Sequence, residues 1–246
     1  MPITSNIYDF YKSEPSVQEA FRTLRTNIQF ASVDKPIKTL LLTSAIPSEG
    51  KTTIALALAM SMTEAGKKTL LVEMDCRRPM LGNRLKLRPQ YNWVNMLYSD
   101  ISVSDVAVPT KVKNLYFLDV EPQMTHLVEI ISSTKFSTML RSLQSEFESI
   151  IFDTPPLGAY IEAAVLSKKT DGVILVIGSG KVDVKKEQEV IAQLQKASAN
   201  IIGVVLNGVK YNQTKYGYYQ YYKNEEQSSK RKKRSAERPD KPDGKR

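Results

Sequence analysis

The sequence of 246 residues contains one cysteine and one histidine, Cys76 and His126. A lone cysteine excludes a disulfide within the chain, and these two side chains are too few for a structural zinc site of the usual kind. Long hydrophobic runs are also missing, since none approaches the roughly 18 apolar residues that cross a bilayer. Residues 1–15 contain no apolar signal core. We therefore expect a soluble protein of the reducing cytoplasm.

Acidic residues are outnumbered, because 35 lysines and arginines face 26 aspartates and glutamates, which gives a formal net charge of +9. Part of this excess lies in the run Lys230–Arg234, within a segment, 227–246, that has no large apolar side chain. Such a segment cannot offset the entropy of ordering its backbone, so we expect a disordered basic tail. Basic runs of this kind are usually solvated and weakly selective, and no specific nucleic-acid partner is expected.

Short apolar runs alternate with helical patterns along most of the chain. The runs are continuously apolar, which is typical of strands buried on both faces, and they cover 39–43, 68–73, 115–119, 149–153, 173–177 and 201–206. Helical patterns cover 52–65, 134–145 and 184–197. This alternation predicts an α/β fold, a parallel sheet with helices on both faces. We assign one domain to 36–210, preceded by an N-terminal segment, 1–35, and followed by a tyrosine-rich segment, 211–226.

The N-terminal segment contains an amphipathic pattern that predicts a helix over Ser16–Phe30. Apolar side chains recur there at helical spacing, at Val17, Phe21, Leu24 and Ile28. The other face of this helix is expected to carry the charged residues Glu19, Arg22 and Arg25.

The strongest motif is TSAIPSEGKTT at 43–53, between the first predicted strand and the first long helix. A loop in this position can direct backbone N–H groups toward phosphate oxygens, with the positive end of the helix dipole behind them. Lys51 would reach the β and γ phosphates of a nucleotide, and the Thr52 hydroxyl would bind Mg²⁺. Ala45 stands where the full pattern has glycine, and it fits if its backbone is helical or extended. The residues expected to bind nucleotide are Ser48, Glu49, Gly50, Lys51, Thr52 and Thr53.

Two carboxylates, Glu73 and Asp75, follow the second apolar run. They would share one side if the strand continued to Asp75. At the carboxyl end of a strand they could hold Mg²⁺ through water or accept a proton from an attacking hydroxyl. The alternative is an acidic strand end that Arg77 or Arg78 neutralises.

Asp153 follows the apolar residues 150–152 and precedes Thr154–Pro156. This arrangement has the form of a Walker B segment, in which a strand presents one carboxylate to the metal; an ordinary aspartate at a strand end is the alternative. Asn207 ends the last predicted strand. It could contact the base of a nucleotide, or it could only cap the turn with Gly208.

Six tyrosines crowd the polar stretch 211–222. Each hydroxyl is a potential phosphate acceptor, and several phosphates so close together would reverse the local charge. The expected acceptors are Tyr216, Tyr218, Tyr219, Tyr221 and Tyr222. Without the phosphate-binding motif, an aromatic patch for packing or stacking would be the simpler interpretation.

In this order, the motifs resemble those of the bacterial tyrosine kinases that regulate capsule and exopolysaccharide synthesis, in their form as a separate cytoplasmic chain. The resemblance extends from Glu14 to about Tyr222 and rests on 19–25, 44–53, 73–79, 152–156 and the tyrosine cluster. It implies a P-loop NTPase-like fold and transfer of the γ-phosphoryl group of ATP, with Mg²⁺, to tyrosine. The catalytic residues would be Lys51, Glu73, Asp75 and Asp153, and the metal would lie at Thr52, Asp75 and Asp153. Glu73 stands where the family usually has aspartate.

The resemblance also implies partners. Glu19, Arg22 and Arg25 would form the subunit contact of a ring-like homo-oligomer, in which each tail enters the neighbouring active site and phosphorylation loosens the ring. A membrane polysaccharide co-polymerase would be the activator and would recruit the chain to the inner face of the plasma membrane. A tyrosine phosphatase would reverse the modification.

Two other functions are compatible with a phosphate-binding loop. One is a partitioning or cell-division ATPase that switches between surface-bound and free states, although those relatives usually carry a second lysine where this chain has Ile46. The other is a non-catalytic scaffold that binds nucleotide and gates polysaccharide assembly through its oligomeric state.

Overall fold

The computed structural model describes residues 7–31 and 35–209. Residues 7–31 and 35–208 belong to one compact unit. The predicted phosphate-accepting tyrosines and the basic tail lie outside the described residues, so those predictions stay untested. Within the described ranges, no helix is both long and apolar enough to span a bilayer.

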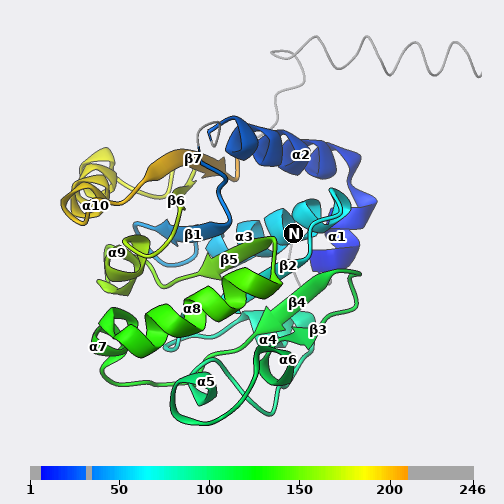
Figure 1. Ribbon diagram of the computed structural model, residues 1–246. Helices are drawn as coiled ribbons and strands as arrows, with labels where there is room; N and C mark the ends of the chain where they lie inside the picture. Colours follow the sequence, from blue (N-terminus) through cyan, green and yellow to red (C-terminus); the bar gives the residue numbers. More distant parts are fainter. Residues whose placement is uncertain (1–6, 32–34, 210–246) are drawn as a thin grey trace, which may run out of the picture. The chain divides into compact units, whose positions relative to one another are not determined.

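A seven-stranded sheet runs through the described part of the chain, in the order β3-β4-β2-β5-β1-β6-β7 (Figure 1). Neighbouring strands in this sheet are parallel except for the pair β3–β4, which is antiparallel. The predicted parallel sheet is therefore confirmed. The two-residue edge strand β3 gives no signal in the sequence. The strands are β1 (Thr39–Ser44), β2 (Thr69–Glu73), β3 (Val108–Pro109), β4 (Leu115–Leu118), β5 (Ser149–Asp153), β6 (Gly172–Gly178) and β7 (Ile201–Asn207).

Helices cover both faces of the sheet, as the continuous apolar runs predict (Figure 1). The edge strand β7 is the exception, because none of its residues is buried and Val204 and Leu206 are more than half exposed. Every residue of β1, β2 and β5 is buried. Side chains alternate along a strand, so Leu40 and Leu42 belong to one core, whereas Leu41 belongs to the other. The first core lies under α1 (Ile7–Ser13), α2 (Pro15–Phe30) and α3 (Lys51–Glu64), and the second under α7 (Leu127–Ser132), α8 (Thr134–Glu146), α9 (Glu162–Ser167) and α10 (Val184–Lys196).

Helix α3 is apolar around most of its circumference because it lies between α2 and the sheet. It begins at Lys51, directly after the phosphate-binding motif, and its last turn is closed by the bond from the Gly66 N–H to the Thr63 carbonyl, 2.9 Å. Gly66 has φ +85°, as expected for a glycine that ends a helix. The local sequence thus determines both ends of the helix that carries the nucleotide motif.

Helix α2 has the predicted apolar face, and Ile28 is buried in the first core. Its charged residues do not all lie on the opposite face. Arg22 is exposed and pairs with Glu19 at 2.7 Å within the helix, but the Arg25 guanidinium donates to the carbonyl and the hydroxyl of Ser61 in α3. Arg25 therefore departs from the prediction because its long side chain reaches its own domain. The subunit contact of these residues remains a prediction.

The elements that the sequence pattern does not reveal are short. Helices α4 (Leu81–Leu85), α5 (Asn95–Tyr98), α6 (Val103–Val106), α7 and α9 have four to six residues each, too few for a helical period to stand out. Helix α1 is also unexpected. It is held by Tyr11, which is buried and donates from its hydroxyl to Glu64 at 2.9 Å.

Candidate nucleotide and phosphoryl-transfer site

The loop between β1 and α3 contains two residues with positive φ, Ser48 at +66° and Gly50 at +100°. The backbone angle requires glycine, and a Cβ on Gly50 would lie 2.1 Å from the amide nitrogen of Asn207, so the Asn207 side chain would have to move. Ala45 is buried and is not among the residues with positive φ, so alanine fits at this position, as the sequence analysis required. The loop thus departs from the full motif without strain at the substituted position.

Two carbonyl groups of this loop are held from outside. The Lys181 ammonium donates to the Ser48 carbonyl at 2.7 Å, and the Asn207 amide donates to the Glu49 carbonyl at 2.8 Å. Both peptide bonds are trans, so each N–H points away from the preceding carbonyl oxygen. The N–H groups of Glu49 and Gly50 therefore point away from Lys181 and Asn207, in the loop directly before the first turn of α3. This arrangement suits a phosphate group.

Glu49 supports the loop with its side chain. The carboxylate is fully buried and accepts hydrogen bonds from the Ile46 N–H at 2.9 Å and from the Gly178 N–H at 2.8 Å. It therefore joins the start of the loop to the end of β6. Any contact of Glu49 with nucleotide must be made by its backbone. Asn207 has a comparable supporting position, and its predicted contact with a base remains a prediction.

Lys51 is 93% shielded from solvent at the start of α3. Burial lowers the pKa of its ammonium group, while the surrounding carboxylates of Asp153, Asp75, Glu49 and Glu73 act in the opposite direction. These four carboxylates influence one buried ammonium. Such an excess of negative charge in a buried site favours a bound cation.

Asp153 ends β5, with β1 on one side and β2 on the other, where it is paired with Leu42 and Glu73. Its side chain is buried, and its Oδ1 atom has no hydrogen-bond partner within the described residues. Burial raises the pKa of Asp153 to about 6, although a hydrogen bond from Thr52 and the charge of Lys51 act to lower it. A buried carboxylate oxygen without a partner, next to a hydroxyl, fits a Mg²⁺ ligand set of hard oxygen atoms. Thr52 and Asp153 are thus brought together as the sequence predicts.

Glu73 and Asp75 occupy different environments. Strand β2 ends at Glu73, whose carboxylate is fully buried and accepts from three backbone N–H groups, those of Met80 (2.8 Å), Leu81 (2.9 Å) and Asp75 (3.2 Å). Burial and the charge of Asp153 nevertheless raise the pKa of Glu73 well above its ordinary range. Glu73 therefore fastens the loop after β2 and the start of α4.

Asp75 lies in the loop itself and is only half-buried. Its Oδ1 atom accepts from the backbone N–H groups of Arg77 and Arg78, at 3.2 and 3.0 Å. The two arginines thus contact Asp75 through their main chain and do not neutralise it with their side chains. Of the two carboxylates predicted as proton acceptors, the geometry favours Asp75, because an incoming hydroxyl can reach it.

The sequence analysis gave Arg77 as a possible partner of Glu73 and Asp75. In the structure its side chain binds a different carboxylate. Its guanidinium donates to Glu162 at 2.6 Å and lies 4.2 Å from the centre of the Tyr160 ring. The other carboxylate oxygen of Glu162, Oε2, is buried without a partner among the described residues. Arg77 and Glu162 border a cavity of about 530 Å³ together with the start of α7. Glu162 lies 85 residues from Arg77 in the chain, which is why local motifs did not reveal it.

Comparison with known proteins agrees with this geometry. Residues 48–203 match the AAA domain family. The chain is 34% identical to the tyrosine-protein kinase YwqD of Bacillus subtilis over 202 residues, which cover 82% of this chain and 85% of that protein. It is also similar to the crystal structure of the chimerical protein CapA2B2, with a TM-score of 0.78, 29% identity, and coverage of 86% of this chain and 92% of the other.

The fold itself is more widely shared. The septum site-determining protein MinD of Pyrococcus horikoshii, solved with Mg-ADP, is similar with a TM-score of 0.57 and 23% identity over 69% of each chain. That likeness extends to the arrangement of strands and helices alone, whereas the identity to YwqD extends over most of both sequences. The chain therefore belongs to the family of bacterial tyrosine kinases of capsule and exopolysaccharide synthesis.

Proposed function

We propose that this chain is a protein-tyrosine kinase that transfers the γ-phosphoryl group of Mg-ATP to the tyrosines of its own C-terminal cluster. The observation that carries the proposal is the buried Asp153 oxygen, which has no partner among residues 7–31 and 35–209 and lies beside Thr52 and Lys51 at the phosphate-binding loop. The acceptors would be Tyr216, Tyr218, Tyr219, Tyr221 and Tyr222. Family membership supports tyrosine as the acceptor type.

The loop would bind the nucleotide through groups that are already oriented. Backbone N–H groups of Glu49 and Gly50, with the Lys51 ammonium, would contact phosphate oxygens and offset the charge that develops on them during transfer. Thr52 and Asp153 would hold the metal directly or through water, with Asp75 at the more exposed side. Bound Mg²⁺ supplies further neutralisation of the phosphate oxygens.

Asp75 would accept the phenolic proton of the attacking tyrosine. The new bond joins the tyrosine oxygen to the γ-phosphorus, and the bond from that phosphorus to the bridging oxygen breaks, which leaves ADP. Glu73 would act indirectly, because it holds the loop in which Asp75 lies. A carboxylate that is half-exposed can accept this proton and return it to solvent.

Regulation would follow the family pattern. The chain would work at the inner face of the plasma membrane, with a polysaccharide co-polymerase as activator. It would assemble through Glu19, Arg22 and Arg25, and each subunit would phosphorylate the tail of a neighbour. A tyrosine phosphatase would restore the starting state. The internal bond of Arg25 to Ser61 makes Glu19 and Arg22 the stronger candidates for the contact between subunits.

The test is phosphate mapping by mass spectrometry on the full chain, incubated with Mg-ATP and the cytoplasmic segment of the candidate co-polymerase. We expect phosphate on Tyr216–Tyr222, and none in Lys51→Ala. Lys185→Ala is the matched control, since Lys185 is exposed and outside the site. Unmodified tyrosines under conditions in which calorimetry registers Mg-ATP binding would reject the kinase function.

The same experiment separates the alternatives. ATP hydrolysis that DNA or lipid stimulates, without phosphotyrosine, would indicate a surface-switching ATPase with the fold seen in MinD. Nucleotide-dependent assembly without hydrolysis or transfer would indicate a scaffold.

A further inference from the structure

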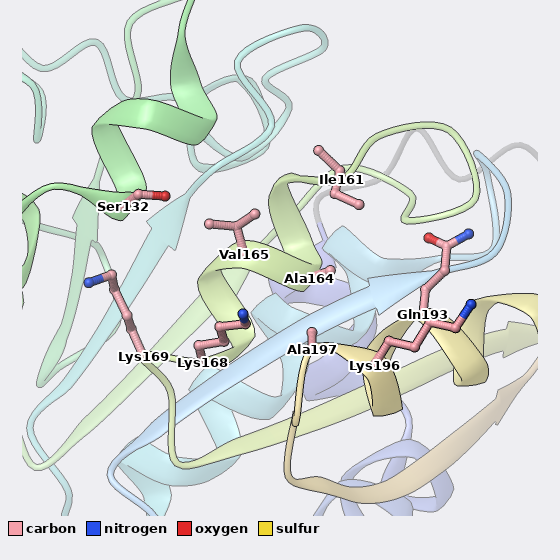
Figure 2. Close-up of a pocket in the computed structure, with 9 residues that line it drawn as sticks. All are labelled: Ser132, Ile161, Ala164, Val165, Lys168, Lys169, Gln193, Lys196 and Ala197. Carbon is pink, nitrogen blue, oxygen red and sulfur yellow. The ribbon is translucent and has the colours of Figure 1, made fainter.

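A second cationic region lies on the face of the molecule formed by α9 and α10, apart from the phosphate-binding loop. It is a groove of about 580 Å³, within the roughly 300–1,000 Å³ typical of ligand pockets. We call it the lysine groove and define it by Lys168, Lys169 and Lys196, together with Ala164, Val165 and Ala197 (Figure 2). None of the described residues that line it is acidic.

The groove combines an apolar floor with a charged rim. Ala164 and Ala197 are buried, Val165 is half-buried, and Ile161 is 55% exposed at the end nearest the start of α9. Lys168 and Lys196 are exposed, and they come from the ends of two different helices (Figure 2). The floor suits a ring or an aliphatic chain, and the rim suits an anion attached to it.

Lys169 is the most constrained of the three lysines. It is half-buried, and its ammonium donates to the Ser137 hydroxyl at 2.6 Å. An ammonium group has three donors, so two of them are available to a ligand. The bond to Ser137 also reduces the side-chain entropy that the lysine would lose when an anion binds.

We propose that the lysine groove binds phosphotyrosine, supplied by the tyrosine-rich segment 211–226 of another copy of this chain. The proposal rests on the proposed function, because phosphotyrosine is the product of that reaction. A phosphotyrosine is an apolar ring that carries a dianion, and it therefore matches both parts of the groove. The unmodified segment lacks the dianion, so phosphorylation would switch this contact on.

The groove is connected to the proposed active site through neighbouring residues. Ile161 borders the groove, and the next residue, Glu162, holds Arg77 in the loop that follows Asp75. Helix α9 also contacts β1, the strand that leads into the phosphate-binding loop. A phosphorylated tail bound along α9 would thus report the state of one subunit to the site of another.

The experiment measures binding of a labelled synthetic peptide of residues 211–226, phosphorylated at Tyr216, Tyr218, Tyr219, Tyr221 and Tyr222, to the full chain. Mg-ADP is present so that the phosphate-binding loop is occupied. We expect fluorescence anisotropy to show binding at least about tenfold tighter than for the unphosphorylated peptide, since the phosphates add negative charge that the lysines of the groove attract. A peptide with phosphoserine at the same five positions keeps the charge but lacks the rings, and we expect it to bind more weakly.

Two triple variants test the location. K168E/K169E/K196E should weaken binding of the phosphotyrosine peptide about tenfold or more, because opposite charges become like charges. K111E/K113E/K186E makes the same change in net charge at exposed lysines outside the groove and should leave the affinity within about twofold. Equal weakening by both triple variants would overturn the proposal, because binding would then follow net charge alone.

Equal affinity for the phosphoserine and phosphotyrosine peptides would overturn the specificity for the ring. Unchanged affinity in K168E/K169E/K196E would overturn the site. Because the peptide is phosphorylated chemically, these results do not depend on the catalytic activity of the chain. Failure of the phosphate mapping experiment would reject the kinase function while leaving the measured affinity of the groove intact.

Discussion

The phosphate-binding loop and the lysine groove both contain lysine side chains, but they are built in opposite ways. Lys51 is almost fully buried, and the loop around it is fixed by Glu49, Lys181 and Asn207. The groove presents the exposed Lys168 and Lys196 and the half-buried Lys169, whose ammonium donates to Ser137, beside an apolar floor. The side chains that fix the loop join it to the ends of β6 and β7. In the groove, Lys168 and Lys196 are exposed at the surface.

This difference has an energetic reason. Buried polar groups must be satisfied by partners, so changing one of them leaves another unpaired at about 1–3 kcal/mol. Exposed lysines are hydrated in the absence of ligand, so changing them has little effect on folding. Substitutions in the loop should therefore affect stability and function together, and substitutions in the groove should affect binding alone.

The largest effect is expected for Gly50→Ala. The added Cβ would meet the Asn207 amide at 2.1 Å, and a non-glycine residue at φ +100° is strained, so we expect a loss of about 2–5 kcal/mol in unfolding free energy. Nucleotide affinity should fall with it. Denaturant unfolding and calorimetry with Mg-ATP measure the two quantities.

The variant Asn207→Ala separates the two reasons for which Gly50→Ala is expected to destabilise the fold, the steric conflict and the backbone strain. The double variant Gly50→Ala/Asn207→Ala removes the steric conflict but keeps the backbone strain, so it should be less destabilised than the sum of the two single variants. Strict additivity would contradict the contact between Gly50 and Asn207.

A pH-dependent effect of about 3 kcal/mol is expected from Asp153. Its pKa is about 6 in the folded chain and 3.8 as the ordinary value, a difference of about two units at 1.36 kcal/mol each. Between these pH values the folded state binds more protons than the unfolded state, so this group makes unfolding easier as the pH rises. The metal-free Asp153→Asn variant should therefore gain stability over the wild type from about pH 4 to 6, and the gain should then level off.

Urea unfolding across pH 4 to 8 in the presence of a chelator measures this difference. Comparison with the wild type cancels the contributions of carboxylates that do not interact with Asp153, whereas Glu73, whose pKa the charge of Asp153 raises, adds to the difference in the same direction. A gain that shrinks as the pH rises would contradict the raised pKa of Asp153. The same variant should lose phosphotyrosine formation with Mg-ATP.

A smaller effect, about 1–3 kcal/mol, is expected for Glu73→Asp. Aspartate is the residue that the family usually has here, but a side chain one methylene shorter cannot keep the bonds to Met80 and Leu81 in this backbone. We expect lower thermal stability and no gain in phosphotyrosine. A large gain in phosphotyrosine would show instead that glutamate attenuates the site.

The smallest effect is expected for K168E/K169E/K196E. Its unfolding free energy should stay within about 1 kcal/mol of the wild type, and its affinity for Mg-ATP should be unchanged. Differential scanning fluorimetry with and without Mg-ATP checks both. Loss of Mg-ATP binding in this variant would mean that the lysine groove and the phosphate-binding loop are coupled in the fold and are not built independently.

The sequence predicts local features of this molecule well. The loop at 43–53, the long helix after it and the buried strands depend on neighbouring residues, and the structure contains each of them. Glycine at position 50 and glycine at position 66 are both required by positive φ, which is a local property. Motif and period are therefore sufficient for the main strands, the long helices and the position of the loop between β1 and α3.

The contacts that support the site could not be predicted from the sequence, because they join distant parts of the chain. Glu49 binds Gly178 across 129 residues, and Asn207 binds Glu49 across 158 residues. Lys181 carries no motif and gives no sign that it holds the Ser48 carbonyl. The role of Glu73 also depends on tertiary structure, because the chain returns at Met80 to the end of β2 and the Met80 N–H donates to Glu73.

Helix α3 connects two ends of the domain as one stiff rod of 14 residues, about 21 Å long at 1.5 Å per residue. One end begins at Lys51, and the other holds Arg25 through Ser61 and Tyr11 through Glu64. If α3 moves as one rigid unit, a displacement of α1 or α2 by a neighbouring molecule would also displace the Lys51 ammonium. Subunit assembly and phosphate binding would then be coupled through α3.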